Sequence, residues 1–183
     1  MSKLLWGITG SGDQLEDVLN VMGRLQEITE IQISVVISKA GEQVLRRYKL
    51  WERLNETFDK VKTETNANVP FVAGPLQVGK YNLFVVAPLT ANSTAKIAHG
   101  IADTLITNAV AQTLKGSIEV LVYPVDQNPD EVETHAPDGT VFKILPRQID
   151  LDNVAALRAT PNVTVARDPN ELFEMIKTRE KAF

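Results

Sequence analysis

The sequence contains no cysteine and only two histidines, and these shortages restrict its chemistry. Without cysteine, the chain has no disulfide, no thiolate nucleophile and no cysteine-bound zinc or iron–sulfur cluster. The histidines, His99 and His135, lie far apart in the sequence, so an ordinary zinc or non-haem iron site is not expected. We therefore expect no bound metal.

Long apolar runs and clusters of basic residues are missing as well. No apolar segment is long enough to cross a bilayer, and the short apolar run after Lys3 does not make a signal peptide. The formal net charge is -4, and no run of lysines and arginines alternates with aromatic residues. We therefore expect a cytoplasmic protein that binds neither membranes nor nucleic acids.

The chain alternates between strand-like and helix-like patterns. Short, bounded apolar runs predict strands at residues 3–8, 31–37, 83–87, 118–124 and 163–165. Apolar spacing of three and four predicts helices at residues 15–28, 42–55 and 150–158, after Asp168, and from the loop at 90–94 to about residue 115. A hairpin is expected at 133–144 around Asp138 and Gly139.

This alternation predicts one α/β domain over residues 1–183. With 183 residues, of which 44% are hydrophobic and 23% charged, the chain can bury a core without cross-links. Strands that are joined through helices form parallel pairs with right-handed crossovers. The predicted fold is a Rossmann-like three-layer sandwich, with helices on both faces of a mostly parallel sheet.

Individual residues set the expected boundaries of these elements. Asp13 with Glu16, and Asp168 with Glu171, have the spacing of capping boxes at the starts of helices. Pro88 is expected to end its strand, because proline cannot donate a hydrogen bond to a neighbouring strand.

A polar segment separates the second predicted helix from the third predicted strand. Residues 63–70 read as irregular, and Gly74 with Pro75 marks a turn. Asn66 and Asn68 in this segment are either turn residues or amides that contact a ligand.

Loops of small and polar residues follow three of the predicted strands. They are Gly7–Gly12 with the sequence GITGSG, residues 38–41 beginning with Ser38, and residues 90–94 with the sequence TANST. Carboxyl ends of parallel strands share one edge of the sheet, and the free amides at a helix N-terminus favour a phosphate. The three loops are therefore expected to meet at one phosphate-bearing ligand.

The spacing of the first loop restricts what that ligand is. Its pattern is G-x-x-G-x-G, which differs from the dinucleotide fingerprint G-x-G-x-x-G and lacks the lysine of a P-loop. Neither NAD binding in the Rossmann manner nor nucleotide hydrolysis follows from it. For this loop alone, a tight turn without a ligand is the alternative.

The three loops and the helix after the third one resemble the homo-oligomeric flavin-containing cysteine decarboxylase superfamily. Within it, the chain is most similar to the archaeoflavoproteins and the dihydromethanopterin reductase (acceptor) flavoproteins. The resemblance covers nearly the whole chain. The segments that carry it are LLWGITGSGD, SKAGEQVLRRYKLW, TNANVPFVAGPLQVGKY, GIADTLITNAVAQTLKG, YPVDQN and IDLDNVAALR.

The resemblance implies non-covalently bound FMN, held at the boundary between identical subunits in a trimer or a multiple of trimers. The cofactor-binding residues that it implies are Thr9, Gly10, Ser11, Gly12, Ser38, Pro88, Thr90, Ala91, Asn92, Ser93, Asp103 and Asn108. Of these, residues 9–12 and Ser38 would hold the phosphate and the ribityl chain. Asn66, Asn68 and Asp126 are weaker candidates for the lining of an acceptor pocket.

The chain departs from two sequence patterns of this superfamily, and these differences exclude two of the reactions that its members catalyse. Decarboxylase relatives carry a P-x-M-N-x-x-M-W segment, which this chain lacks, so cysteine decarboxylation is not expected. Prenyltransferase relatives have arginine and glutamate after the fifth strand, where this chain has Val125, Asp126 and Gln127. Asp126 would repel a prenyl phosphate, and Gln127 suits a hydrogen bond to a neutral heterocycle.

The resemblance thus implies an FMN-dependent oxidoreductase. It would pass electrons from NAD(P)H, or from an iron–sulfur or flavin partner protein, to a dihydropterin of the dihydromethanopterin type. One alternative is an FMN electron-transfer protein that docks to such a partner and has no small-molecule substrate. A relative with an empty site is a third reading. No catalytic residue is assigned, because the flavin would supply the redox chemistry.

Overall fold

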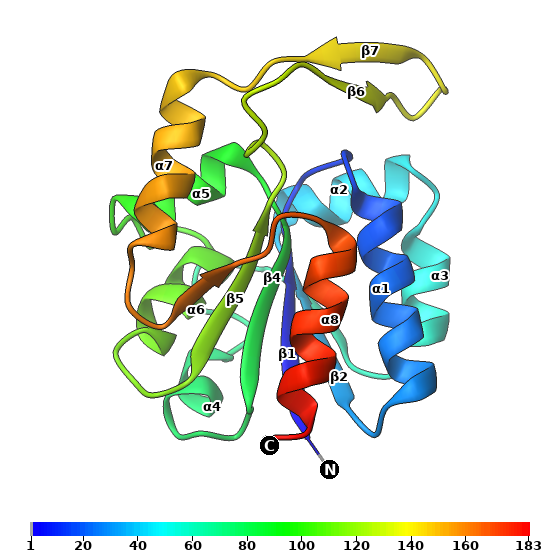
Figure 1. Ribbon diagram of the computed structural model, residues 1–183. Coiled ribbons are helices and arrows are strands. Elements are labelled where there is room, and N and C mark those ends of the chain that lie inside the picture. The colour runs from blue at the N-terminus through cyan, green and yellow to red at the C-terminus, as the bar shows by residue number, and fades with distance from the viewer. Residues whose placement is uncertain (1) are drawn as a thin grey trace.

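The computed structural model describes residues 2–183 and contains a six-stranded parallel sheet covered by helices on both faces (Figure 1). In spatial order, the strands are β3 (Val61–Thr63), β2 (Gln32–Ile37), β1 (Lys3–Ile8), β4 (Leu83–Leu89), β5 (Glu119–Pro124) and β8 (Val163–Val165). The helices are α1 (Leu15–Ile28), α2 (Lys39–Arg47), α3 (Trp51–Thr57), α4 (Ala73–Gln77), α5 (Ala91–Ala98), α6 (Leu105–Thr113), α7 (Gln148–Arg158) and α8 (Pro169–Glu180). The predicted Rossmann-like three-layer fold is confirmed.

Two apolar clusters hold the helices on opposite faces of the sheet. Helices α1, α2, α3 and α8 pack on one face, and α4, α5, α6 and α7 pack on the other (Figure 1). Side chains alternate along β1, so Leu4 and Trp6 enter the first cluster and Leu5 enters the second. Because both faces are covered, β4 is buried along its whole length.

Strand β1 lies where the strand order reverses. The chain runs outward from β1 through β2 to β3, and then returns to the other side of β1 at β4. The hydroxyl of Thr9 joins the loops after β1 and β4, since it donates to the carbonyl of Pro88 at 2.7 Å and accepts from the N–H of Thr90 at 2.9 Å. Open α/β sheets bind ligands beside such a reversal point.

The predicted central helix is two helices. Helix α5 ends at Ala98, and the N–H of Gly100 then donates to the carbonyl of Ile97 while the N–H of Ile101 donates to that of Lys96. Gly100 has a φ of +71°. This is a Schellman motif, which ends a helix and turns the chain away. Thr104 starts α6 with a capping box.

The predicted helix over 42–55 is also divided, and by the same motif. Lys49 has a φ of 58° and donates its N–H to the carbonyl of Arg46, while the N–H of Leu50 donates to that of Leu45. The helix at 39–47 therefore ends there, and α3 starts at Trp51. Apolar spacing carries across the break because both pieces pack on the same face of the sheet.

Asp13 does not cap α1, so the expected capping box with Glu16 is wrong. The residue before the helix is Gln14, with a φ of 57° and no side-chain cap. Asp13 instead accepts a hydrogen bond from the Thr134 hydroxyl at 2.9 Å, which ties it to the hairpin. A long-range contact has replaced the local one.

Two expectations about the middle of the chain are wrong. Strand β4 passes through Pro88 to Leu89, because a shift of register against β5 between Val86 and Leu89 accommodates a residue without an N–H. The segment read as a turn at Gly74 and Pro75 is the short helix α4, and β3 begins just before the irregular segment.

Two other expectations are confirmed. The hairpin consists of β6 (Val132–His135) and β7 (Val141–Ile144), and its turn includes Gly139 with a φ of +85°. Asp168 caps α8 by accepting the N–H of Glu171 at 2.8 Å, as expected. The second bond of the expected capping box is replaced, because the Glu171 carboxylate accepts the N–H of Arg167 and not that of Asp168. The hairpin lies beyond the carboxyl edge of the sheet, at the end opposite the two termini (Figure 1).

Candidate functional site

The carboxyl edge of the sheet contains a cavity of about 480 Å³ among α2, α5 and α6. Its volume lies within the range of roughly 300–1,000 Å³ that is typical of cofactor sites. The predicted cofactor residues that line it are Thr9, Gly10, Ser38, Thr90, Asn92, Ser93 and Asp103. The other lining residues are Lys39, Ala40, Glu64, Thr104 and Ile106. The loops after β1, β2 and β4 thus meet at one cavity.

Three helices begin at this cavity, each with a hydroxyl residue as its N-cap. Ser38, Thr90 and Thr104 cap α2, α5 and α6, and each side chain accepts the N–H three residues later, at 3.0, 3.2 and 3.3 Å. The positive ends of three helix dipoles therefore surround one space. Such an arrangement favours an anion.

Several hydrogen-bond donors are left over at the cavity. The amide N–H groups of Gly10, Ala40 and Asn92 have no partner within residues 2–183. The Ser38 hydroxyl accepts one hydrogen bond and keeps its own O–H, as does that of Ser93, which accepts from Thr90 at 3.1 Å. This donor set fits a phosphate, which accepts hydrogen bonds through its oxygens.

The glycines of the first loop allow it to pack closely against α2 and the residue after it. A Cβ on Gly10 would lie 2.6 Å from the Cβ of Ala40, and one on Gly12 would overlap the Tyr48 hydroxyl. Larger residues at these positions would push the loop away from Ser38. Packing against Ala40 therefore requires a glycine at position 10, whether or not a phosphate binds.

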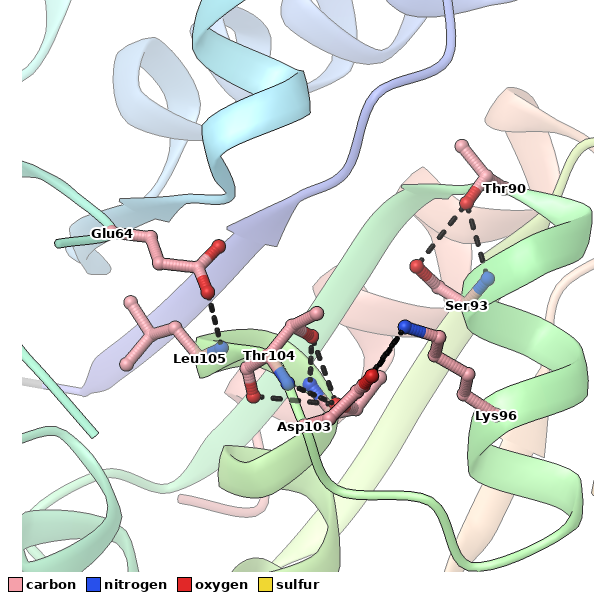
Figure 2. A network of polar contacts seen from close by, with 8 residues as sticks. Glu64, Thr90, Ser93, Lys96, Asp103, Thr104 and Leu105 are labelled. Atoms are coloured by element: carbon pink, nitrogen blue, oxygen red, sulfur yellow. Dashed lines mark hydrogen bonds and ion pairs between the residues drawn. The ribbon is translucent and has the colours of Figure 1, made fainter. Parts of the chain in front are cut away.

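Glu64 is a residue of the cavity that the sequence did not indicate. Its Oε1 accepts the N–H of Leu105 at 3.0 Å (Figure 2). Its Oε2 accepts the N–H of Lys39 at 3.1 Å, so Glu64 connects the starts of α2 and α6. It was missed because its segment read as irregular. No strand was expected before Glu64, so no local pattern placed it at the edge of the sheet.

Asp103 lines the cavity as an ion pair. Lys96 Nζ lies 2.8 Å from its Oδ2, and the two side chains face each other across the break between α5 and α6 (Figure 2). The hydrogen bond from Lys96 lowers the pKa of Asp103. The carboxylate therefore stays ionised, with its charge balanced locally.

The remaining predicted cofactor residues do not line this cavity. Ser11 donates to the carbonyl of Asp13, and Asn108 donates to that of Ala67, so both side chains hold loops in place. Pro88 lies near the end of β4 and Ala91 is the first residue of α5, so they lie on either side of the lining residue Thr90 in the sequence. Gly12 faces a different cavity.

The three predicted acceptor residues are also outside the cavity. Asn66 accepts the N–H of Asn68 at 3.0 Å, which is a local turn. Asp126 follows β5, and burial raises its pKa, with the charge of Asp150 adding to the effect and the backbone of Ala91 opposing it. Asp126 therefore lies close to the start of α5.

Both N–H donors of Gln127 are used within the fold, so this side chain has no N–H left to donate to a heterocycle. Its amide donates to the carbonyls of Pro124 and Ala166, and its oxygen accepts from Arg158. The side chain joins the ends of β5 and β8 to α7. Its role is structural.

A second cavity, of about 540 Å³, lies under the hairpin. Asp13, Glu16, Asp17 and Glu133 are among its lining residues, and they make it acidic. It is larger than the first cavity, but its carboxylates would repel a phosphate. The smaller cavity, with its helix starts and free donors, is therefore the better site for a phosphate-bearing ligand.

Residues 2–183 contain neither a cluster of metal-binding side chains nor a membrane-spanning helix. No cluster of three or more histidine, aspartate or glutamate side chains is arranged to hold a metal ion. Among the same residues, no helix combines the length and the apolar character needed to cross a membrane.

Fold and cavity together define a Rossmann-like α/β protein with a cavity at the carboxyl edge of its sheet that suits an anionic group. The chain belongs to the Flavoprotein family, whose model matches residues 1–182. It is 43% identical to an uncharacterized protein of Methanocaldococcus jannaschii, over 96% of this chain and 95% of that one.

Two further relatives are named dihydromethanopterin reductase (acceptor). The one from Methanocaldococcus jannaschii is 36% identical over 74% of this chain and 58% of its own length. The one from Methanosarcina mazei is 33% identical over 81% of this chain and 61% of its own length. The chain thus matches about three fifths of each reductase. The expected family resemblance is confirmed.

Solved structures agree with this assignment. Burkholderia xenovorans DmrB, described as a cubic protein cage for redox transfer in complex with FMN, superposes with a TM-score of 0.84. The two are 34% identical, over 99% of this chain and 96% of that one. A dodecameric FMN-dependent decarboxylase of Escherichia coli O157:H7, at 16% identity and a TM-score of 0.67, shares the fold.

Proposed function

We propose that this chain is a single flavoprotein domain that binds FMN non-covalently in the cavity of about 480 Å³. The observation that carries the proposal is the convergence of three capped helix starts on one cavity with free donors. Family membership supports it, as does the FMN complex of DmrB, which is 34% identical over almost the whole chain.

The residues present fit this cofactor. The hydroxyls of Ser38 and Ser93 and the free amides near them offer donors to a phosphate, and Lys39 adds a positive charge at the cavity wall. The first loop can lie close to such a group because Gly10 has no side chain. Bound FMN would supply the transfer of electrons, and the chain would bind and orient it.

For the reaction, we propose electron transfer to a dihydropterin acceptor. The names of two relatives support this class of substrate, and NAD(P)H or a redox partner protein would be the electron source. Asp126, Asn66 and Asn68 are the proposed acceptor contacts. With its raised pKa, Asp126 is the side chain among them best suited to deliver a proton to the acceptor.

The alternative is an FMN electron-transfer protein without a small-molecule substrate. The description of DmrB as a cage for redox transfer supports it. We also propose that the chain works in the cytoplasm as a homo-oligomer, a trimer or a multiple of trimers. The cubic and dodecameric assemblies of two structural neighbours support an assembly of identical subunits.

One anaerobic experiment separates these functions. The purified protein is first assayed for bound FMN, then reduced, and then mixed in turn with dihydromethanopterin, dihydrofolate and candidate redox proteins. Rapid reoxidation of the flavin by a pterin supports the reductase, and reoxidation by a protein partner alone supports the carrier. Protein that neither contains FMN nor binds it when added would overturn both.

A further inference from the structure

Glu64 places an oriented carboxylate in the wall of the cavity. It follows β3, and its two oxygens accept backbone N–H groups from Lys39 and Leu105, at 3.1 and 3.0 Å. In Figure 2, Glu64 lies at one end of the network of polar contacts and Thr90 with Ser93 lies at the other end, with Leu105 between them. Two helix starts therefore fix the position of the carboxylate.

This carboxylate is not neutralised by a basic side chain. The other acidic residue of the cavity, Asp103, is paired with Lys96 at 2.8 Å, whereas within residues 2–183 no lysine, arginine or histidine lies within ion-pair distance of Glu64. The positive ends of α2 and α6 face this carboxylate. No ion pair therefore occupies its oxygens within residues 2–183.

Each oxygen of Glu64 still has capacity to accept a hydrogen bond. An ionised carboxylate has about four acceptor positions, and the two backbone amides use two of them. An acceptor-only group repels the oxygens of a phosphate and attracts hydroxyl donors. Acidic side chains commonly bind sugar hydroxyls of nucleotide cofactors in this way.

We propose that Glu64 is the residue that recognises the hydroxyl-bearing chain of the bound cofactor. Its carboxylate would accept hydrogen bonds from the polyol, while the hydroxyls of Ser38 and Ser93 serve the phosphate. The cavity is then divided into a region of donors and a region of acceptors, and this division fixes which way round a flavin mononucleotide binds. The inference rests on the proposed function, because it takes the ligand to be a flavin.

The test compares three flavins in fluorescence titrations of the apoprotein. Lumiflavin has only the ring, riboflavin adds the polyol, and FMN adds the phosphate. In Glu64→Gln, we expect the affinities for riboflavin and FMN to fall about tenfold, because a hydrogen bond to a charged acceptor is lost. The affinity for lumiflavin should change less than twofold.

Two control variants show that the effect belongs to the charge at this position. Glu56→Gln removes the same charge from an exposed position on α3 and should bind all three flavins as the wild type does. Glu64→Asp keeps the charge and should recover part of the lost affinity. Circular dichroism of each variant shows whether the fold is retained.

The possible outcomes are distinguishable. An equal loss for all three flavins would mean that Glu64 only holds the helices together, and unchanged affinities would mean that it contacts no ligand; either overturns the proposal. A gain for FMN over riboflavin would show that Glu64 repels phosphate, which also overturns it. A wild-type protein that binds no flavin would refute the proposed function itself.

Discussion

Side-chain hydroxyls at the cavity act first as helix caps. Ser38, Thr90 and Thr104 each accept a backbone N–H, and this fixes where their helices begin. The sequence predicts that Ser38 and Thr90 gather here, because small polar residues after strands are a local pattern. Glu64 could not be found in this way, since its two partners lie on α2 and α6, far from it in the chain.

A charge placed at Ser38 should empty the site without unfolding the protein. Aspartate and asparagine are both good N-caps, so Ser38→Asp and Ser38→Asn should each keep α2 in place. We expect Ser38→Asp to weaken FMN binding at least tenfold, because a carboxylate would face the phosphate, and Ser38→Asn to weaken it only a few-fold. Equal FMN affinities of the two variants, measured by fluorescence titration, would contradict the proposed phosphate position.

The buried carboxyl of Asp126 lowers the stability of the folded protein by an amount that depends on pH. Burial raises its pKa above the ordinary value of 3.8, so the ionised form is less favourable in the folded state than in the unfolded state. We expect Asp126→Asn to raise the free energy of unfolding at pH 7. The gain should shrink as the pH falls from the raised pKa to below 3.8, where wild-type Asp126 is protonated in both states.

Urea unfolding at several pH values, at one fixed protein concentration, measures this effect. A gain that stays constant from pH 7 to below pH 4 would show that burial does not perturb the carboxyl. If Asp126 also serves the acceptor, the same variant should reoxidise more slowly with a pterin. The stability gain and the loss of rate would then come from one buried carboxyl group.

At the level of elements, the main differences between expectation and structure are two helix breaks. Apolar spacing predicted single helices over 42–55 and through Gly100, and the structure divides both by Schellman motifs. Gly100 was a readable signal, since glycine favours positive φ, but Lys49 was not. Periodicity did not show either break, because the two pieces of each helix pack on the same face of the sheet.

Replacing Gly100 or Gly23 with alanine should change the free energy of unfolding in opposite directions, because only Gly100 has a positive φ. Gly100 has a φ of +71°, so Gly100→Ala should lower the free energy of unfolding by about 1 kcal/mol. Gly23 lies within α1, and a Cβ added there would meet no neighbouring atom within 4 Å, so Gly23→Ala should raise it by roughly 0.5–1 kcal/mol. Urea unfolding of both variants at one protein concentration gives the comparison, and the same sign for both would contradict it.

For the whole molecule, the sequence predicted the layers and the edge where the loops meet. Buried strands and amphipathic helices are local patterns, and the parallel order of the sheet brings the ends of β1, β2 and β4 together without further information. The division into two cavities was not predictable. It depends on the hairpin, which is held over the loop after β1 by two hydrogen bonds, from Thr134 to Asp13 and from Tyr48 to the carbonyl of His135.

Several large apolar side chains are exposed on the surface of the chain. Phe71 is 72% exposed, Val78 69% and Leu145 65%. Apolar side chains that gather into one surface patch commonly mark contacts between subunits. We expect the proposed assembly of identical chains to cover these side chains, because a closed symmetric assembly buries the same surface on each copy.

Native mass spectrometry tests this assembly directly. We expect a particle whose mass is three times that of the 20.2 kDa chain, or a multiple of that trimer. Phe71→Glu or Leu145→Glu should lower the mass if the substituted side chain lies in a subunit contact, since an unpaired charge would be buried there. Gln26→Glu adds the same charge at an exposed position on α1 and should leave the mass of the assembly unchanged apart from the substitution itself. A monomer, dimer or tetramer would contradict the trimer, and would leave these side chains without the cover that this assembly provides.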